Sequence, residues 1–283
     1  MHLRTTLLLL TTFTIPAAIY GQANDIPSAA PSSSTASPEQ RGRQLLDQMV
    51  AALGGPAWLN RHTMSTLGHT AAFFRDQPTG ANIEFAEFFQ FPTAGKPQVE
   101  RIEFITPKGM ILPGKKRDVV QVWTPDQGYE LTYKGKTPLP KDQVDDYLRR
   151  RAHSVEAVVA VWLKAPGVVV VSEGTTTVER RAADKITVLS ANNDAVTLDL
   201  DANTHLPLAR TFEWRNQQFK DHDQDREEYD NYQTYDGLPT PLTLSRYHNG
   251  DLVNQRFLSK IDYNQSLPPD TFNPDAPLQQ KKK

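Results

Sequence analysis

The stretch Val196–Trp214, VTLDLDANTHLPLARTFEW, places a polar side chain on every second residue from Asp199 to His205. Oxygen ligands at alternate positions are typical of a calcium loop, which also needs glycine at its sixth position and glutamate at its twelfth. Counted from Asp199, those positions hold Thr204 and Arg210. The stretch therefore does not have the pattern of a calcium loop.

The same stretch has the pattern of two strands joined by a turn. Apolar residues alternate along each half, at Val196, Leu198 and Leu200, and then at Leu206, Leu208, Phe212 and Trp214. Strict alternation favours half-buried β-strands. The connecting residues 201–205 include Asp and Asn, which hydrogen-bond their own backbone and tolerate left-handed φ. The sequence predicts a β-hairpin in which Asp199 faces solvent.

A period of two extends over most of the chain from residue 65. In IEFAEFFQF the predicted inward face holds Ile83, Phe85, Phe89 and Phe91, opposite Glu84 and Gln90. In the last strand Val253, Phe257 and Ile261 form the predicted apolar face, and Asn254, Arg256 and Lys260 the wet one. Asn249-Gly250 between the last two strands is typical of a type I′ hairpin.

Two helical segments interrupt this pattern. Ser37 followed by Pro38 and Gln40 indicates a capped helix, and Gly54-Gly55 ends it. A second helical stretch is expected at about residues 141–164. The predicted fold class is mainly β (α+β), with ten or eleven strands in antiparallel arrangement.

Four segments are expected along the chain. Residues 1–23 have Arg4 before an apolar run and small residues at Gly21 and Ala23, which is typical of a cleaved signal peptide. Residues 24–36 are rich in Ser, Pro and Ala and predict a disordered linker. The folded domain is expected at residues 37–277, followed by a polar, basic tail at 278–283.

Composition excludes several classes of site and partner. The chain has no cysteine, so it has no disulfide, thiolate metal site or thiol nucleophile. Its formal net charge of −2 gives no basic surplus for nucleic acid. No segment of the mature chain reaches the ~20 apolar residues of a membrane-spanning helix.

The order of these elements and the C-terminal motifs resemble a known family. The motifs are LDLDANTHLPL, EYDNYQTYDGLPTPLTLSRYHNG and FLSKIDYNQSLPPDTFNPDAP, within residues 196–277. The chain resembles the periplasmic outer-membrane lipoprotein-sorting (lipoprotein carrier/receptor-like) superfamily, as a divergent member. The resemblance implies a single curved antiparallel sheet forming an unclosed half-barrel, covered by two helical segments that enclose an apolar cavity. It also implies a strand arginine that latches the helices, for which Arg101 is a candidate.

Catalytic and metal motifs are missing from the sequence, and neither an enzyme nor a cofactor or metal is expected; a hydrolase-like activity is the third, weaker alternative. The densest set of potential metal ligands, residues 221–225 (DHDQD), has the composition of a solvated acidic hairpin tip or loop. An apolar site on the concave face is expected instead. Its candidate residues are Phe85, Phe89, Phe91, Phe104, Trp123, Trp162 and Trp214. For each of them ordinary core packing is the alternative.

These observations favour an exported, periplasmic carrier that binds the acyl chain of a lipid or lipidated protein on this concave face. The alternative is an envelope sensor or interaction module that uses the same fold to bind a protein partner and carries no lipid. An unclosed sheet has strand edges that can template such contacts.

Overall fold

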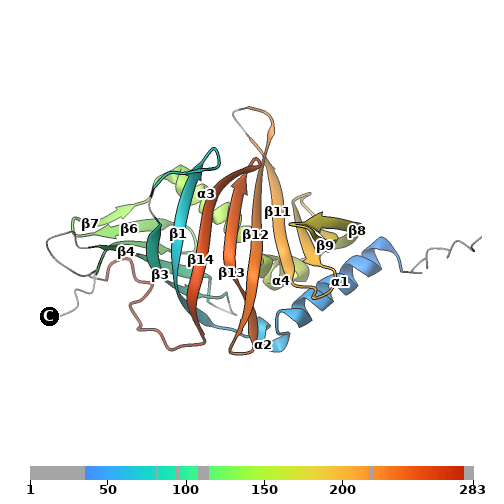
Figure 1. Ribbon diagram of the computed structural model, residues 1–283, viewed down its shortest axis with the longest axis horizontal. Helices are drawn as coiled ribbons and strands as arrows, with labels where there is room; N and C mark the ends of the chain where they lie inside the picture. Colours follow the sequence, from blue (N-terminus) through green and yellow to red (C-terminus); the bar gives the residue numbers. More distant parts are fainter. Residues whose placement is uncertain (1–35, 81, 93–95, 108–114, 217–218, 277–283) are drawn as a thin grey trace, which may run out of the picture. The chain divides into compact units, whose positions relative to one another are not determined.

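The alternating segments form one antiparallel sheet in the computed structural model, which describes residues 36–80, 82–92, 96–107, 115–216 and 219–276. Within those residues the sheet has 14 strands in the order β7-β6-β5-β4-β3-β1-β14-β13-β12-β11-β10-β9-β8, with β2 paired to β1 (Figure 1). The outer strands β7 and β8 are not paired with each other, so the sheet is open. The predicted fold class is confirmed.

The strands are β1 (Thr63–Phe74), β2 (Gln77–Pro78), β3 (Ile83–Gln90), β4 (Val99–Pro107), β5 (Lys115–Trp123), β6 (Gly128–Thr132), β7 (Gly135–Pro138), β8 (Val169–Val178), β9 (Arg181–Leu189), β10 (Ala195–Asp201), β11 (Pro207–Arg215), β12 (His222–Tyr235), β13 (Leu238–His248) and β14 (Asp251–Tyr263). The segments predicted as signal peptide and tail lie outside the described residues, as does the predicted linker apart from Ala36.

Four α-helices lie within the described residues: α1 (Pro38–Ala52), α2 (Pro56–Leu59), α3 (Lys141–Ala152) and α4 (Val155–Ala160), followed by a 3-10 turn at Trp162–Lys164. The predicted capping box of α1 is present, since the Ser37 hydroxyl accepts from the Gln40 N–H and the Gln40 side chain accepts from the Ser37 N–H. The helical stretch expected at about 141–164 is confirmed, and the structure divides it into several helices. Ser154 caps a new helix by accepting from the Ala157 N–H at 3.1 Å, and this separates α3 from α4.

The helices pack on one face of the sheet, which we call the inner face. Leu45, Leu46 and Met49 of α1 are fully buried there. Gly42 lets α1 approach β8 closely, because a Cβ at this position would lie 2.8 Å from the backbone N of Ser172 and the backbone C of Val171. A residue with a side chain would push the helix away from the sheet.

The first and last strands in the sequence, β1 and β14, pair with each other in the middle of the sheet, and β3 lies on the other side of β1 (Figure 1). Met64 faces Phe89 of β3 on one side and Tyr263 of β14 on the other. This pairing joins the two halves of the sheet, and it brings inner-face residues from distant parts of the sequence into neighbouring positions.

Both predicted hairpins are present. Residues 202–206 connect β10 to β11, and the Asp201 carboxylate accepts from the N–H groups of Asn203 and Thr204, each at 2.9 Å. Asn249 and Gly250 both have positive φ, at 52° and 89°. The prediction that Asp199 faces solvent is wrong, because Asp199 is only 5% exposed and accepts a hydrogen bond from Arg226 Nη1 at 2.9 Å. Charged side chains on the outer face of β10 and β12 pair with one another and cover it.

The predicted faces of β14 are wrong before a bulge in the strand and correct after it, where Ile261 is buried and Lys260 is exposed. The pairing of β14 with β1 shifts between Leu67 and Gly68, which face Lys260 and Leu258, so Ser259 is a bulge residue. A bulge reverses which residues point inward on its two sides. Arg256 consequently lies on the inner face, 4.5 Å from the ring centre of Phe85. Phe257 points outward and is 39% exposed.

Candidate functional site

A cavity of about 310 Å³ lies between the inner face of the sheet and helices α2, α3 and α4. Side chains of β1, β3, β4 and β11–β14 or of the turns at their ends form its floor. One part of the lining, which we call the apolar wall, consists of Leu53, Trp58, Met64, Phe89, Phe91, Val155, Leu244 and Leu258. The other part is ionisable: Arg61, Arg150, Arg151, Arg210, Arg256, Glu87, Glu100, Glu156 and Glu227.

The apolar wall is built on the alternation of β3. Phe89 and Phe91 point inward as successive inner-face residues, and their rings meet edge to face with centres 4.8 Å apart. Arg61 closes this end of the cavity, since its guanidinium lies 4.1 Å from the ring centre of Trp58 and 4.0 Å from that of Phe91. Its Nη2 donates to Glu156 Oε1 at 2.9 Å. Both faces of this cation are therefore covered by aromatic rings, and its charge is paired.

Two glutamates on neighbouring strands share a buried position on the cavity floor. Burial opposes ionisation of Glu87, but the charge of Arg256, which donates to Glu87 at 2.7 Å, outweighs it and lowers the pKa of Glu87. Burial and the adjacent charge of Glu87 raise the pKa of Glu100 well above its usual value. Tyr147 of α3 donates a hydrogen bond to Glu100. Glu100 thus holds a proton under conditions in which Glu87 is ionised, and the pair carries one negative charge.

Arg210 is the largest fully buried side chain of the described residues, at 2% exposure. Its Nη2 lies 3.2 Å from Asp225 Oδ1 and 3.5 Å from Glu227 Oε2. Burial opposes its positive charge, but Tyr229, Glu227 and Asp225 more than compensate and raise the pKa of Arg210. Its Nε and Nη1 make no hydrogen bond with any described residue. The cavity floor therefore contains a permanent cation with unused donors.

Asp225 corrects the sequence-based interpretation of residues 221–225. The sequence predicts a solvated acidic hairpin tip or loop here. Asp221 does lie in the tip between β11 and β12, but His222 begins β12 and Asp225 is fully buried. Alternation along β12 turns Asp225 inward, where it accepts from both Arg210 and Arg246. Within the described residues no group of three or more His, Cys, Asp or Glu side chains could hold a metal ion.

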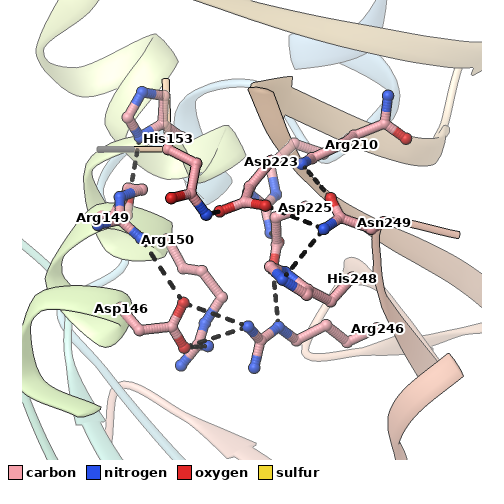
Figure 2. Close-up of polar contacts among 12 residues, drawn as sticks. Asp146, Arg149, Arg150, His153, Arg210, Asp223, Asp225, Arg246, His248 and Asn249 are labelled. Atoms are coloured by element: carbon pink, nitrogen blue, oxygen red, sulfur yellow. Dashed lines mark hydrogen bonds and ion pairs between the residues drawn. The ribbon is translucent and has the colours of Figure 1, made fainter. Parts of the chain in front are cut away.

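Helix α3 is attached to the sheet by charged side chains (Figure 2). Arg246 of β13 donates through Nε to Asp225 at 2.8 Å and through Nη2 to Asp146 of α3 at 3.1 Å. Asp146 also accepts from Arg150, one turn further along α3. Arg246 is thus the strand arginine that contacts the covering helix. Arg101, the candidate from sequence, instead donates to Glu103 on its own strand at 2.8 Å.

The seven aromatic residues singled out from the sequence do not gather at one place. Phe89 and Phe91 line the cavity. Phe85 is buried with its ring against Gly68, and Phe104 lies opposite it on β4. Trp123 is stacked beneath Tyr147, with ring centres 3.9 Å apart. Trp162 and Trp214 pack against the core cluster, Trp162 beside His153 and Trp214 beneath the Arg149 guanidinium.

Sequence reasoning missed the charged half of the cavity. The signal was present, because Glu87 occupies an inward position between Phe85 and Phe89, and Arg210 is flanked at alternate positions by Leu208 and Phe212. A charged residue in an otherwise apolar face is rarely buried without a partner. Such residues therefore indicate a buried ionic network, although the sequence does not show which residues pair.

An antiparallel sheet that is not closed, with a lined cavity between its inner face and its helices, defines a class of open half-barrels. The volume is at the lower end of the ~300–1,000 Å³ of small-molecule sites. No described helix has the length and apolar character needed to cross a membrane.

Comparison with solved structures finds proteins of similar fold. A DUF1329 family protein from Desulfovibrio piger is similar over 84% of this chain and 98% of its own, with a TM-score of 0.56 and 11% identity. A domain described as an outer membrane lipoprotein-sorting protein, from Vibrio parahaemolyticus, is similar over 83% of this chain and 97% of its own, with a TM-score of 0.52 and 9% identity. No family model matches the sequence, and no curated protein does. The predicted resemblance is confirmed as a likeness of fold, and the chain is a divergent example of it.

Proposed function

We propose that the protein binds an acyl chain in the cavity and acts as a non-enzymatic carrier of a lipid or lipidated protein. The observation that carries this proposal is the apolar wall, where Phe89, Phe91 and Trp58 border a partly open cavity beneath the helices. Each methylene buried there contributes about 0.8 kcal/mol. The small volume favours one chain over several.

The proposal includes a cell compartment. The apolar N-terminal run of residues 1–23 and the fold shared with a lipoprotein-sorting domain support export to the periplasm. The rival function, an envelope module that binds a protein and no lipid, is separated from the carrier by native mass spectrometry of protein purified from its own host. Co-purifying lipid supports the carrier, and a bare mass under gentle conditions supports the rival.

Phe89→Ala tests the site. Phe89 is only partly buried and borders the cavity, so its truncation removes contacts with a bound chain while costing less than the ~3–5 kcal/mol of a filled core aromatic. We expect several-fold weaker binding of a fluorescent fatty acid and a folded protein.

Phe257→Ala is the matched control, because Phe257 lies on the outer face away from the cavity. It should leave probe binding unchanged. Equal loss of binding in both variants, or no binding of the probe to the wild type, would refute the acyl-chain site.

A further inference from the structure

Resting on the proposed function, we propose that the ligand is a single-chain amphiphile with an anionic head group, carboxylate or phosphate. The head group binds beside Arg210 and Arg150, and the chain lies along the apolar wall. The two parts of the cavity lining are the basis for this assignment, since a site for a plain hydrocarbon has no use for buried arginines.

The buried cation Arg210 and the aromatic part of the apolar wall lie in different rows of the cavity floor. The strand register aligns Arg210 with Glu227 across β11 and β12, and it aligns Phe89, Met64 and Tyr263 across β3, β1 and β14. Other ionisable residues lie beside the apolar wall, with Glu100 opposite Phe89 and Arg61 over Phe91, but these are paired with Tyr147 and Glu156. A molecule that contacts both Arg210 and the apolar wall needs a polar head and an apolar tail.

The charge of the whole lining favours an anion. Five arginines and four glutamates line the cavity, and the Glu87–Glu100 pair carries only one negative charge between them. Arg256 is compensated by Glu87, Arg61 by Glu156, and Arg150 by Asp146. Arg151 donates to the backbone carbonyls of Thr124 and Pro125, and among the described residues no carboxylate forms an ion pair with it. The lining therefore holds more positive than negative charge.

Arg210 supplies donors for the head group. It is fully buried, borders the cavity, and has two nitrogen atoms without a hydrogen-bond partner among the described residues. An unpaired buried donor is costly, and more so when it carries charge. A bound carboxylate or phosphate would accept from these atoms, as planar guanidinium groups bind such anions in two-pronged fashion.

The negative charge of Glu227 weakens the attraction between the arginines of the lining and an anionic head group. Glu227 lies 3.5 Å from Arg210, and the charges of Arg210, Arg150 and Arg256 keep its pKa low despite burial. The ionised Glu227 competes with an incoming anion for the same arginines. Removing its charge while keeping its shape should therefore strengthen anion binding.

Four probes with the same C12 chain separate head group from tail: dodecanoate, dodecyl phosphate, dodecanol and dodecyltrimethylammonium. Calorimetric titration of the full folded domain, below the micelle concentration of each probe, measures their affinities. We expect at least one of the two anions to bind about tenfold or more tightly than dodecanol, and the cation to bind most weakly. The ratio of dodecanoate to dodecyl phosphate assigns the head group as carboxylate or phosphate.

Glu227→Gln should tighten dodecanoate binding several-fold and leave dodecanol binding unchanged. Glu228→Gln is the control on the same strand, because Glu228 faces outward and pairs with Arg226; it should change neither. Dodecanol or the cation binding as tightly as both anions, or no gain in Glu227→Gln, overturns the anionic head group while leaving the acyl site intact. Failure of all four probes to bind overturns both proposals.

Discussion

We expect the charged contact between α3 and the sheet to hold α3 over the cavity. Asp146→Asn removes the carboxylate that pairs with Arg246 of β13 and Arg150 of α3. The Asp225–Arg246 pair on the sheet stays intact in this variant. The substitution therefore weakens the attachment of one helix without leaving a buried aspartate unpaired.

The magnitude follows from the geometry. The Arg246 and Asp146 side chains are 23% and 34% exposed, at a separation of 3.1 Å. The contribution of such a half-buried pair to stability is intermediate. An exposed ion pair contributes ~0.2–1 kcal/mol, and removing one partner of a buried pair costs ~3–5 kcal/mol. Arg150 and Arg246 repel each other once the shared carboxylate is lost. We expect a loss of about 1–2 kcal/mol in the free energy of opening α3, which is roughly a five- to thirtyfold rise in the open population.

Hydrogen exchange measures this directly, because amide exchange through local opening scales with the open population. Amides of α3 should exchange faster by that factor, whereas those of β12 and β13 should be nearly unchanged. Since Tyr147, Arg150 and Arg151 of α3 line the cavity, a bound fatty acid should also dissociate faster.

Asp145→Asn is the control for the Asp146 variant. Among the described residues Asp145 forms an ion pair with Lys141 alone, one turn away on its own helix, so its loss should change α3 exchange by at most a small factor. Equal acceleration in the two variants would mean that the charge of α3, and not its contact with β13, determines its stability. Unchanged exchange in Asp146→Asn would refute the attachment outright.

Gly42→Ala should destabilise the fold by about 1 kcal/mol, since the added Cβ meets the β8 backbone and overpacking of ~1–3 kcal/mol exceeds the ~1 kcal/mol gained in helix propensity. Urea unfolding measures it, and a stabilised variant would contradict the close approach of α1. Glu100→Gln should gain stability relative to wild type as the pH rises from about 4 to about 8, as followed by urea unfolding across that range. The raised pKa of Glu100 means that its proton stabilises the fold below the unfolded pKa, and this contribution is lost as the pH rises through the folded pKa. A constant difference between the two proteins would show that Glu100 titrates normally.

Several elements could be predicted from the sequence because their determinants are local. The capping box of α1 needs only Ser37 and Gln40, and the last hairpin needs only Asn249 and Gly250 to accept positive φ. Alternation within each strand predicted half-buried antiparallel strands, and the family resemblance implied the open half-barrel. These features depend on residues a few positions apart, whose interactions form in nearly any tertiary context.

The cavity and its charges were decided only by the tertiary structure. Arg246 meets Asp146 across 100 residues of sequence, and Arg256 meets Glu87 across 169. One bulge residue in β14 turned Arg256 inward and Phe257 outward, although the sequence pattern indicated the opposite. Alternation defines two faces of a strand, but the register against its neighbours determines which face is buried. For that reason the sequence predicted a half-barrel with aromatic side chains, whereas its ionic floor depends on which distant strands pair.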